Sequence, residues 1–306
     1  MINKQKKGIT YNPKYHSEEQ QDISSTKKIY QKFWYGLIKR NYHYLTAGSR
    51  VLPSFFVIGG VRCGTTSLYH YLGQHNCIKP AAYDELGYFD DNYHLGLNWY
   101  RSLFTTKSIQ KKVESNYGKF LTYDVTPFYI YNPLVVDRIS KFSPEVKIIA
   151  SLRNPIDRAY SNFNDRIQRE GDTKTTFKKI VEQEIEFIEK NIDNQNYQFL
   201  VNTFYESLLA RGLYAKQLEY WFKKIPKENI CIISSEDLQV NTDNILSEIF
   251  EFLNIPKQKI QDTTRQNNIE YPKMDVSTRK ILNDFFKPYN EKLFELLGKR
   301  FNWNDE

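Results

Sequence analysis

The sequence predicts an α/β fold, a single domain with a mostly parallel central sheet and helices on both faces. Short apolar runs of strand length alternate along the chain with longer segments of helical periodicity. The first strand runs directly into a glycine-bounded turn and a helix. A chain of 306 residues with 40% hydrophobic residues is also large enough to bury one sizeable core.

The N-terminal part differs in composition from the rest. Residues 1–24 are polar, and we expect them to be disordered. A basic amphipathic helical extension follows over residues 25–50, with Ile29, Phe33 and Leu37 on one stripe of the helix candidate at 25–46. Such a helix can make peripheral contact with a membrane surface or pack on its own domain. The sequence leaves both interpretations open.

The remaining elements follow from apolar patterning. Strands are expected at 54–59, 120–124, 146–152 and 229–234, and helices at 64–74, 132–141, 155–170, 175–191, 206–224, 242–254 and 277–297.

The first strand-to-helix junction has the pattern of a phosphate-binding loop. Glycines let successive backbone N–H groups point at an anion, and the helix N-terminus adds partial positive charge. Gly59 and Gly64 have the spacing of the nucleotide-triphosphate loop, but Thr65 stands where that motif has its lysine. A kinase interpretation is therefore weakened. We expect a P-loop-like site whose anion contacts come from Arg62, Cys63, Gly64, Thr65, Thr66 and Ser67.

A second junction of the same kind follows the strand at 146–152. Asn154 suits a helix N-cap and Pro155 a first helical turn. Arg153 leaves the strand at its carboxyl end, where open parallel sheets bind ligands. Ser161 lies two turns into the helix, so Arg153 and Ser161 can together bind a second phosphate.

Together the two motifs resemble the sulfotransferase family that uses 3′-phosphoadenosine 5′-phosphosulfate, in the branch of heparan sulfate N- and 3-O-sulfotransferases and their bacterial relatives. The resemblance runs from about Pro53 to the C-terminus and includes Arg211-Gly212-Leu213-Tyr214 and Tyr271-Pro272-Lys273-Met274. It implies a sulfotransferase domain over residues 51–306. It also implies that the first loop holds the 5′-phosphosulfate, that Arg153 and Ser161 hold the 3′-phosphate, and that adenosine 3′,5′-bisphosphate is the product.

Sulfuryl transfer leaves negative charge on the bridging oxygen and removes a proton from the acceptor, so the site needs a fixed cation and a base. Arg62 stands in the place of the family's catalytic lysine. Arginine can neutralise the leaving oxygen but cannot donate a proton at neutral pH. The reaction does not require a metal, and no cluster in the sequence has metal-ligand spacing.

The resemblance implies that Glu85 is the base, because a glutamate just before an aromatic pair serves this role in the glycosaminoglycan branch. The alternatives are that Asp84 and Glu85 are solvated loop carboxylates, or that His94 is the base, as a histidine is in small-molecule sulfotransferases. Asp90 and Asp124 are expected to contact the acceptor.

The acceptor is expected to be a hydroxyl or amine of a carbohydrate or glycoconjugate. Gly87 and Val125 replace a histidine and a lysine of the 3-O-sulfating members. Their loss removes polar contacts near the acceptor, which argues against heparan sulfate itself.

The last candidate segment is the polar loop at 261–270. It occupies the place where the family has a segment that closes over the 3′-phosphate, and Arg265 is its one cation. Two other functions stay open from the sequence, a nucleotide-dependent kinase and a non-catalytic nucleotide-binding module.

Charge and composition narrow the class of partner. The net charge of +7 suits an anionic cofactor, and the sequence has no nucleic-acid-binding motif. The cysteines Cys63, Cys77 and Cys231 are odd in number and are expected to be small buried hydrophobes in a reducing compartment. We find no signal-peptide core or apolar run of membrane-spanning length, which favours a bacterial cytoplasmic enzyme. The oligomeric state is left undetermined.

Overall fold

The structure, a computed structural model, describes residues 40–171, 175–192, 197–266 and 270–303. The chain divides into two compact units, residues 1–45 and 46–306. In the first unit the described residues form the short helix α2 (Arg40–Leu45). The expected disordered segment and most of the expected helix at 25–46 lie outside the described residues and stay predictions. No helix among the described residues is long and apolar enough to span a membrane.

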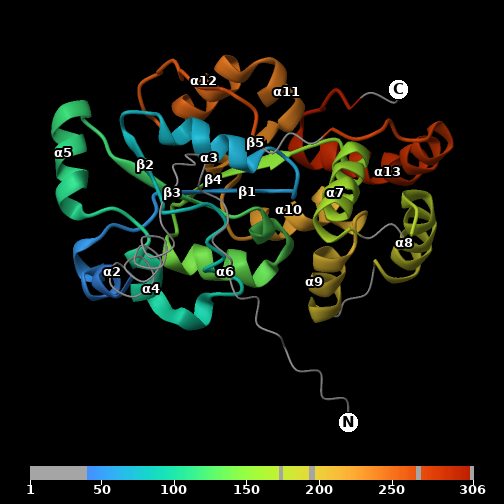
Figure 1. Cartoon of the computed structure of the whole chain (residues 1–306), viewed down its shortest axis with the longest axis horizontal. Coiled ribbons are helices and arrows are strands. Elements are labelled where there is room, and N and C mark those ends of the chain that lie inside the picture. The colour runs from blue at the N-terminus through green and yellow to red at the C-terminus, as the bar shows by residue number, and fades with distance from the viewer. Residues whose placement is uncertain (1–39, 172–174, 193–196, 267–269, 304–306) are drawn as a thin grey trace, which may run out of the picture. The chain divides into compact units, whose positions relative to one another are not determined.

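Five strands of the second unit form one parallel sheet in the order β2-β3-β1-β4-β5, which confirms the predicted fold class (Figure 1). β1 lies in the middle, and its register with β4 runs to the pair Gly59 and Ser151 at the carboxyl end. The strands are β1 (Phe55–Gly59), β2 (Ile78–Pro80), β3 (Leu121–Val125), β4 (Lys147–Leu152) and β5 (Ile230–Ser234).

Both faces of the sheet are buried. Successive side chains of a strand point to opposite faces, and all the residues of β1 are buried. Phe56 and Ile58 of β1 belong to one hydrophobic cluster, and Phe55 and Val57 to a second. Residues of α3 (Thr65–Gly73), α11 (Ser235–Val240) and α12 (Thr242–Phe252) complete the second cluster. Residues of α6 (Pro133–Phe142), α7 (Pro155–Glu170), α10 (Tyr214–Phe222) and α13 (Val276–Leu297) belong to the first. The two groups of helices cover opposite faces of the sheet (Figure 1).

The helices of this unit mostly match the expected ranges. They are α3 (Thr65–Gly73), α4 (Gly96–Ser102), α5 (Lys107–Tyr117), α6 (Pro133–Phe142), α7 (Pro155–Glu170), α8 (Phe177–Asn191), α9 (Tyr197–Glu206), α10 (Tyr214–Phe222), α11 (Ser235–Val240), α12 (Thr242–Phe252) and α13 (Val276–Leu297). The helices α4, α5, α9 and α11 and the short strand β2 were not predicted; the predicted helix at 206–224 meets α9 only at Glu206. The cysteines are free and buried, as expected.

The predicted helix at 206–224 is wrong in its bounds. The chain forms α9, a break with a 3-10 turn (Ala210–Gly212), and then α10. Glu184 of α8 accepts hydrogen bonds from the backbone N–H groups of Leu208 and Leu209, at 3.0 and 2.7 Å, which replaces helical bonding there. A Cβ on Gly212 would lie 2.7 Å from the Pro155 Cβ, so the break also lets the chain pass close to α7. The break depends on these contacts with distant residues, so the local apolar pattern does not reveal it.

The close approach of Gly59 to Ser151 predicts that a side chain at position 59 lowers the stability of the fold. Gly59 has φ of 149°, and a Cβ there would lie 2.2 Å from the Ser151 carbonyl oxygen. Gly59→Ala should therefore lower the free energy of unfolding by about 2 kcal/mol or more, measured by denaturant unfolding. Gly48→Ala is the control, because a Cβ there meets nothing within 4 Å. Equal stability of the two variants would contradict this account of the β1–β4 contact.

Candidate functional site

The loop after β1 is fixed to β4. The Gly60 N–H donates to the Ser151 carbonyl oxygen at 3.2 Å, and the Ser151 hydroxyl donates to the Cys63 carbonyl oxygen at 2.6 Å. On the other side the Val61 N–H donates to the Tyr131 hydroxyl at 2.9 Å. The loop is therefore rigid on both sides before the chain enters α3.

The N-terminus of α3 faces the loop. Gly64 is its N-cap, with φ of 78°, a conformation that favours glycine. The first backbone N–H groups of a helix have no intrahelical acceptor, and the helix dipole favours an anion beside them. Thr65 and Ser67 are buried in this turn, and Thr66 is partly exposed. Burial raises the pKa of the Cys63 thiol to about 11, so this side chain stays neutral at physiological pH.

Arg62 joins the loop to α7. Its Nε donates to the Ser161 hydroxyl at 3.1 Å, and its Nη1 forms an ion pair with Asp165 at 3.3 Å. Arg153, at the start of the second motif, donates from Nη1 to the Arg62 carbonyl oxygen at 3.2 Å. The structure thus brings together Arg62, Arg153 and Ser161 from the two sequence motifs.

Three arginines from distant segments converge beside α3. Burial lowers the pKa of Arg62, Asp165 opposes the change, and the charge of Arg153 lowers it further. Arg265 is exposed, but nearby protein partly desolvates it and lowers its pKa, and Arg153 again adds to the change. Burial alone lowers the pKa of Arg153, but its interactions, chiefly those with Tyr271, outweigh burial and raise it. A bound anion stabilises the charged form of Arg62 and Arg265 against desolvation and against the nearby charge of Arg153.

The segment that carries Arg265 is attached to α3. The Tyr71 hydroxyl donates to the Thr263 carbonyl oxygen at 2.8 Å, and the Gln266 N–H donates to the Ser67 hydroxyl at 3.0 Å. These contacts place the described part of the 261–270 loop over the first turns of the helix. The side chain of Arg265 comes within the electrostatic range of Arg153 for this reason.

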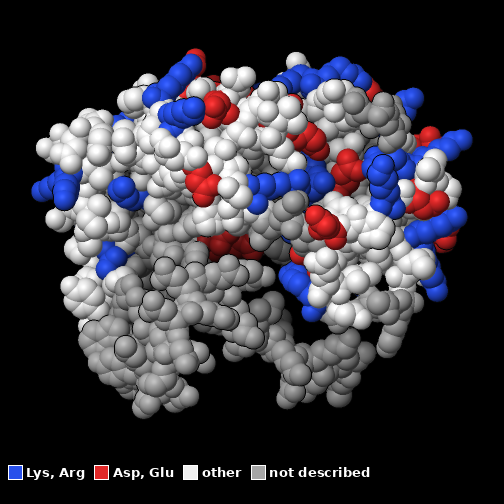
Figure 2. Space-filling view, turned by 45° about the horizontal axis from the view of Figure 1, so that its top comes forward, with Lys and Arg blue, Asp and Glu red and all other residues white. Residues whose placement is uncertain are grey.

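Glu85 lies within electrostatic range of Asp165 and Arg169 of α7. Its side chain is exposed, yet the surrounding protein partly desolvates the carboxyl group and raises its pKa to about 7. Asp84 raises it further, Arg169 of α7 opposes the change, and Asp165 adds a smaller increase. Because Asp165 also pairs with Arg62, Glu85 and Arg62 face the same part of α7. Figure 2 shows a group of acidic side chains with basic side chains near it on the same face.

The backbone is strained at both expected catalytic residues. Among the residues that the structure describes, the non-glycine residues with positive φ are Arg62 at 74°, Glu85 at 56° and Asn254 at 57°. Such conformations cost about 1–3 kcal/mol each and persist where surrounding contacts enforce them, often at functional sites. Two separate loops therefore hold the strained residues Arg62 and Glu85.

Asp90 and Asp124 differ in their surroundings. Asp90 is partly exposed, accepts from the Tyr205 hydroxyl at 3.5 Å, and has a pKa raised to about 6, mainly by desolvation. Asp124 is fully buried, and three hydroxyl groups donate to it. The expected direct contact of Asp124 with an acceptor is therefore corrected, because an enclosed carboxylate presents no surface to a ligand.

His94 lies on the 3-10 helix Tyr93–Leu95 and is outward-facing. One of its ring nitrogens lies 3.0 Å from the Asp91 carbonyl oxygen, and the side chain is exposed. No described contact joins His94 to Arg62 or Arg153. Its assignment as the base stays an untested alternative.

Four residues of the site have contacts that the sequence did not assign. Asp165 orients Arg62, the Tyr131 hydroxyl fixes Val61, and the Tyr214 hydroxyl donates to the Arg153 carbonyl oxygen at 2.9 Å. Tyr271 hydrogen-bonds to the Arg153 side chain. Asp165 follows Ser161 by four residues and so shares its helix face, and Tyr214 and Tyr271 lie in the motifs that carry the family resemblance. Tyr131 has no such signal.

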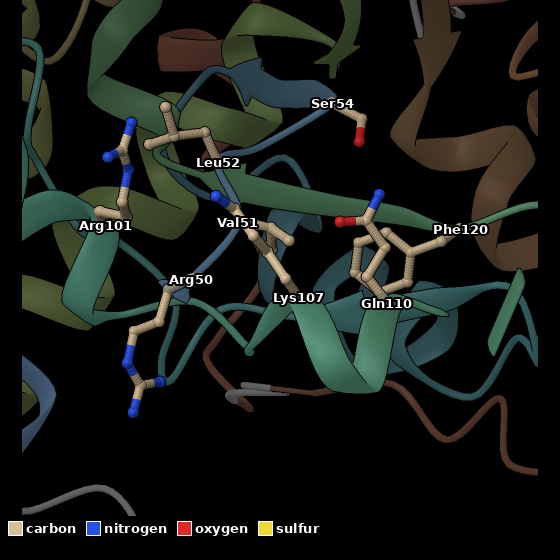
Figure 3. Close-up of a pocket in the computed structure, with 8 residues that line it drawn as sticks. All are labelled: Arg50, Val51, Leu52, Ser54, Arg101, Lys107, Gln110 and Phe120. Carbon is tan, nitrogen blue, oxygen red and sulfur yellow. The ribbon is translucent and has the colours of Figure 1, made fainter. Parts of the chain in front are cut away.

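The described residues enclose two cavities away from this site. One of about 280 Å³ lies at the amino end of β1 and β3, the opposite end from the loop, and is lined by Arg50, Val51, Leu52, Ser54, Arg101, Lys107, Gln110 and Phe120 (Figure 3). The guanidinium groups of Arg50 and Arg101 point in opposite directions in Figure 3, so they do not form one anion site. The other, of about 390 Å³, lies between α8 and α9. No group of three potential ligand side chains among the described residues is placed to hold a metal ion.

Comparisons with known proteins agree on one family. The sulfotransferase domain model matches residues 52–290. The chain is 28% identical over 277 residues to heparan sulfate glucosamine 3-O-sulfotransferase 5 of Mus musculus, covering 82% of this chain and 74% of that protein. It is 27% identical over 321 residues to membrane-associated sulfotransferase kil1 of Dictyostelium discoideum, covering 83% and 67%. Among solved structures, a sulfotransferase from Alicyclobacillus acidocaldarius has a TM-score of 0.62 at 25% identity, covering 83% of this chain and 99% of that chain.

The electrostatic account of Glu85 can be tested directly. Carbon-detected NMR titration of its carboxyl group should give a pKa of about 7. Asp84→Asn should lower that pKa, because it removes a neighbouring negative charge, and Arg169→Gln should raise it, because it removes a positive one. A pKa near the ordinary glutamate value of about 4.3 in the unchanged protein would contradict the account.

Proposed function

This chain belongs to the sulfotransferase domain family, and from that premise we propose that it transfers a sulfuryl group from 3′-phosphoadenosine 5′-phosphosulfate to a hydroxyl or amine of a carbohydrate or glycoconjugate. The observation that carries the proposal is the convergence of Arg62, Arg153 and Arg265 beside the N-terminus of α3. A donor with phosphate groups at two positions needs cationic contacts at two positions, and the two sequence motifs supply them.

The residues present fit this donor. The first turn of α3 and its loop amides suit the 5′-phosphosulfate. Arg153 and Ser161 suit the 3′-phosphate, and Arg265 can approach it from the loop above α3. A hydroxyl has one donor and two acceptor sites. Ser161 can therefore accept from Arg62 and still donate to a phosphate oxygen.

The donor supplies an activated sulfuryl group, and the chain supplies charge and orientation. Arg62 stabilises the negative charge that develops on the leaving oxygen, and Asp165 fixes the direction of its guanidinium. The strained backbone at Arg62 is held by the contacts of its neighbours with Ser151 and Tyr131, so little reorganisation is needed when charge develops.

Glu85 is the proposed base. A carboxyl group with a pKa of about 7 is substantially ionised at neutral pH and still basic enough to take a proton efficiently. Asp90, on the same loop, orients the acceptor.

A carbohydrate acceptor is supported by the names of several relatives and by the side chains near Asp90. Phe128 and Tyr205 stack with ring centroids 5.6 Å apart, and the Tyr205 hydroxyl reaches Asp90. The Arg211 guanidinium lies over the Phe128 ring. Aromatic faces with polar edges suit a sugar, whose ring has both apolar and hydroxyl-bearing faces. The absence of the histidine and lysine at positions 87 and 125 keeps heparan sulfate itself outside the proposal.

The domain limits and location are also proposals. We place the catalytic domain at residues 51–306, after the helical extension at 25–50. A cytoplasmic location remains an expectation of the sequence, and the Dictyostelium relative is named as membrane-associated. Flotation of the full chain with anionic vesicles tests peripheral contact through residues 25–46.

Cofactor recognition gives one prediction. Arg153→Ala should weaken binding of adenosine 3′,5′-bisphosphate by about 10- to 100-fold, because a charge-assisted contact is worth about 1.5–3 kcal/mol. Binding of adenosine 5′-phosphate should change much less, since it lacks the 3′-phosphate. Isothermal titration calorimetry measures both. Arg169→Ala, a change to an exposed arginine of α7, should leave the ratio of the two affinities unaltered. Equal weakening of both ligands by Arg153→Ala would defeat the assignment.

The base gives a second prediction, read out as acceptor-dependent release of adenosine 3′,5′-bisphosphate in a screen of carbohydrate acceptors. The ionised carboxylate is the active form, so kcat/KM should rise with pH through about 7 and then level off. Glu85→Gln should lower turnover by about 10²-fold or more and remove this dependence, with bisphosphate affinity unchanged.

Two variants serve as controls for this experiment. Asp84→Asn should keep near-normal turnover on the high-pH plateau, and His94→Gln tests the histidine alternative. An active Glu85→Gln protein beside an inactive His94→Gln protein would reverse the assignment. Binding of ATP in preference to the bisphosphate, with no acceptor-dependent release, would favour the kinase function instead.

A further inference from the structure

Asp124 lies at the end of β3, fully buried beneath the loop that carries Glu85 and Asp90. Its carboxylate accepts from the hydroxyls of Tyr100 at 2.8 Å, Thr126 at 2.7 Å and Tyr129 at 3.0 Å. A buried carboxylate is costly unless it is well hydrogen-bonded. The three donors meet that requirement, and two of them also accept hydrogen bonds from backbone amides of the loop.

Two of the three hydroxyls continue to the loop. The Thr126 Oγ1 accepts from the Gly87 N–H at 3.3 Å, and the Tyr129 hydroxyl accepts from the Phe89 N–H at 3.1 Å. Each hydroxyl therefore connects Asp124 to one loop amide. For Tyr100 the described contact of the hydroxyl is the one to Asp124.

The direction of these hydrogen bonds depends on the charge of Asp124. An ionised carboxylate only accepts hydrogen bonds, so both hydroxyls must point their protons at it. Their oxygen lone pairs are then directed to the Gly87 and Phe89 amides. With a pKa of about 6, raised mainly by burial, Asp124 is mostly ionised at neutral pH. An asparagine in its place would present donors of its own and compete with this arrangement.

The two connections act on the segment next to the base. The Glu85 N–H donates to the Val125 carbonyl oxygen at 2.6 Å, so the amides of residues 85, 87 and 89 are all anchored to the segment 125–129. Glu85 and Gly87 both have positive φ, at 56° and 59°. A strained turn of this kind persists only where its surroundings hold it in place.

We infer that Asp124 is a positioning residue which, through the Thr126 and Tyr129 hydroxyls, holds the 85–89 loop in the conformation that presents Glu85. This inference rests on the proposed function for the role of Glu85. It does not require Asp124 to touch donor or acceptor. It replaces the acceptor contact that the sequence suggested for this residue.

Single-hydroxyl variants test the connections without altering the carboxylate. Thr126→Val should speed hydrogen exchange of the Gly87 amide, and Tyr129→Phe that of the Phe89 amide, each by about 5- to 10-fold for one lost hydrogen bond, measured by NMR. Each should lower kcat by about tenfold while bisphosphate affinity stays within about twofold, since small displacements of a catalytic group are costly to turnover.

Tyr100→Phe is the matched control. It removes a donor from the same carboxylate and keeps the ring that stacks on Tyr88 at 4.2 Å. It should change neither amide exchange rate and should leave kcat within about twofold. If Tyr100→Phe has the same effects as the other two variants, Asp124 serves stability alone and the inference is overturned.

A double-mutant cycle separates positioning from general destabilisation. Asp124→Asn should lower kcat by about tenfold in the unchanged protein and by less than about twofold in a Glu85→Gln background, where no base remains to be positioned. An equal factor in both backgrounds, or unaltered exchange at Gly87 and Phe89, would overturn the inference. If Asp124→Asn does not fold, the two hydroxyl variants decide the question.

The exchange rates also distinguish this inference from the proposed function. Full turnover in Glu85→Gln would refute the proposed base, whereas the anchoring of the loop by Asp124 would still be decided by the Gly87 and Phe89 amides.

Discussion

The close approach of β1 and β4 at Gly59 and Ser151 is the constraint on which the site depends. At this point the Ser151 carbonyl oxygen accepts from Gly60 and the Ser151 hydroxyl donates to the Cys63 carbonyl oxygen. Both ends of the loop are therefore hydrogen-bonded to one residue of the neighbouring strand. The strained Arg62 lies between them, and α3 begins directly after them.

Electrostatics then distinguishes two groups of residues at the candidate site. Burial, with the charge of Arg153 adding to it, lowers the pKa of Arg62 and of Arg265 beside α3, where the helix dipole also favours an anion. The second group is Glu85 and Asp90, carboxyl groups whose pKa is raised mainly by desolvation. An anion is stabilised by the first group, and a proton can be accepted by the second. Asp165, which pairs with Arg62 and acts on Glu85, couples the two groups.

Buried polar groups supply the rigidity behind both groups of residues. The Ser151 hydroxyl supports the first loop, and the hydroxyls bound to Asp124 support the second. A fully satisfied buried network in a low-dielectric interior is stiff, and a broken one is costly. The strain at Arg62 and Glu85 is therefore offset by contacts that lie outside the reacting groups.

The sequence by itself determined the parallel α/β fold, the two strand-to-helix junctions and the family, because apolar periodicity, glycine spacing and cap residues are local signals. Only the tertiary structure decided that Arg62 pairs with Asp165, that Asp124 is enclosed, and that α9 and α10 are separate helices. Each of these depends on side chains from segments far apart in the chain. Burial and hydrogen-bond direction are set by such neighbours, and no local pattern of residues records them.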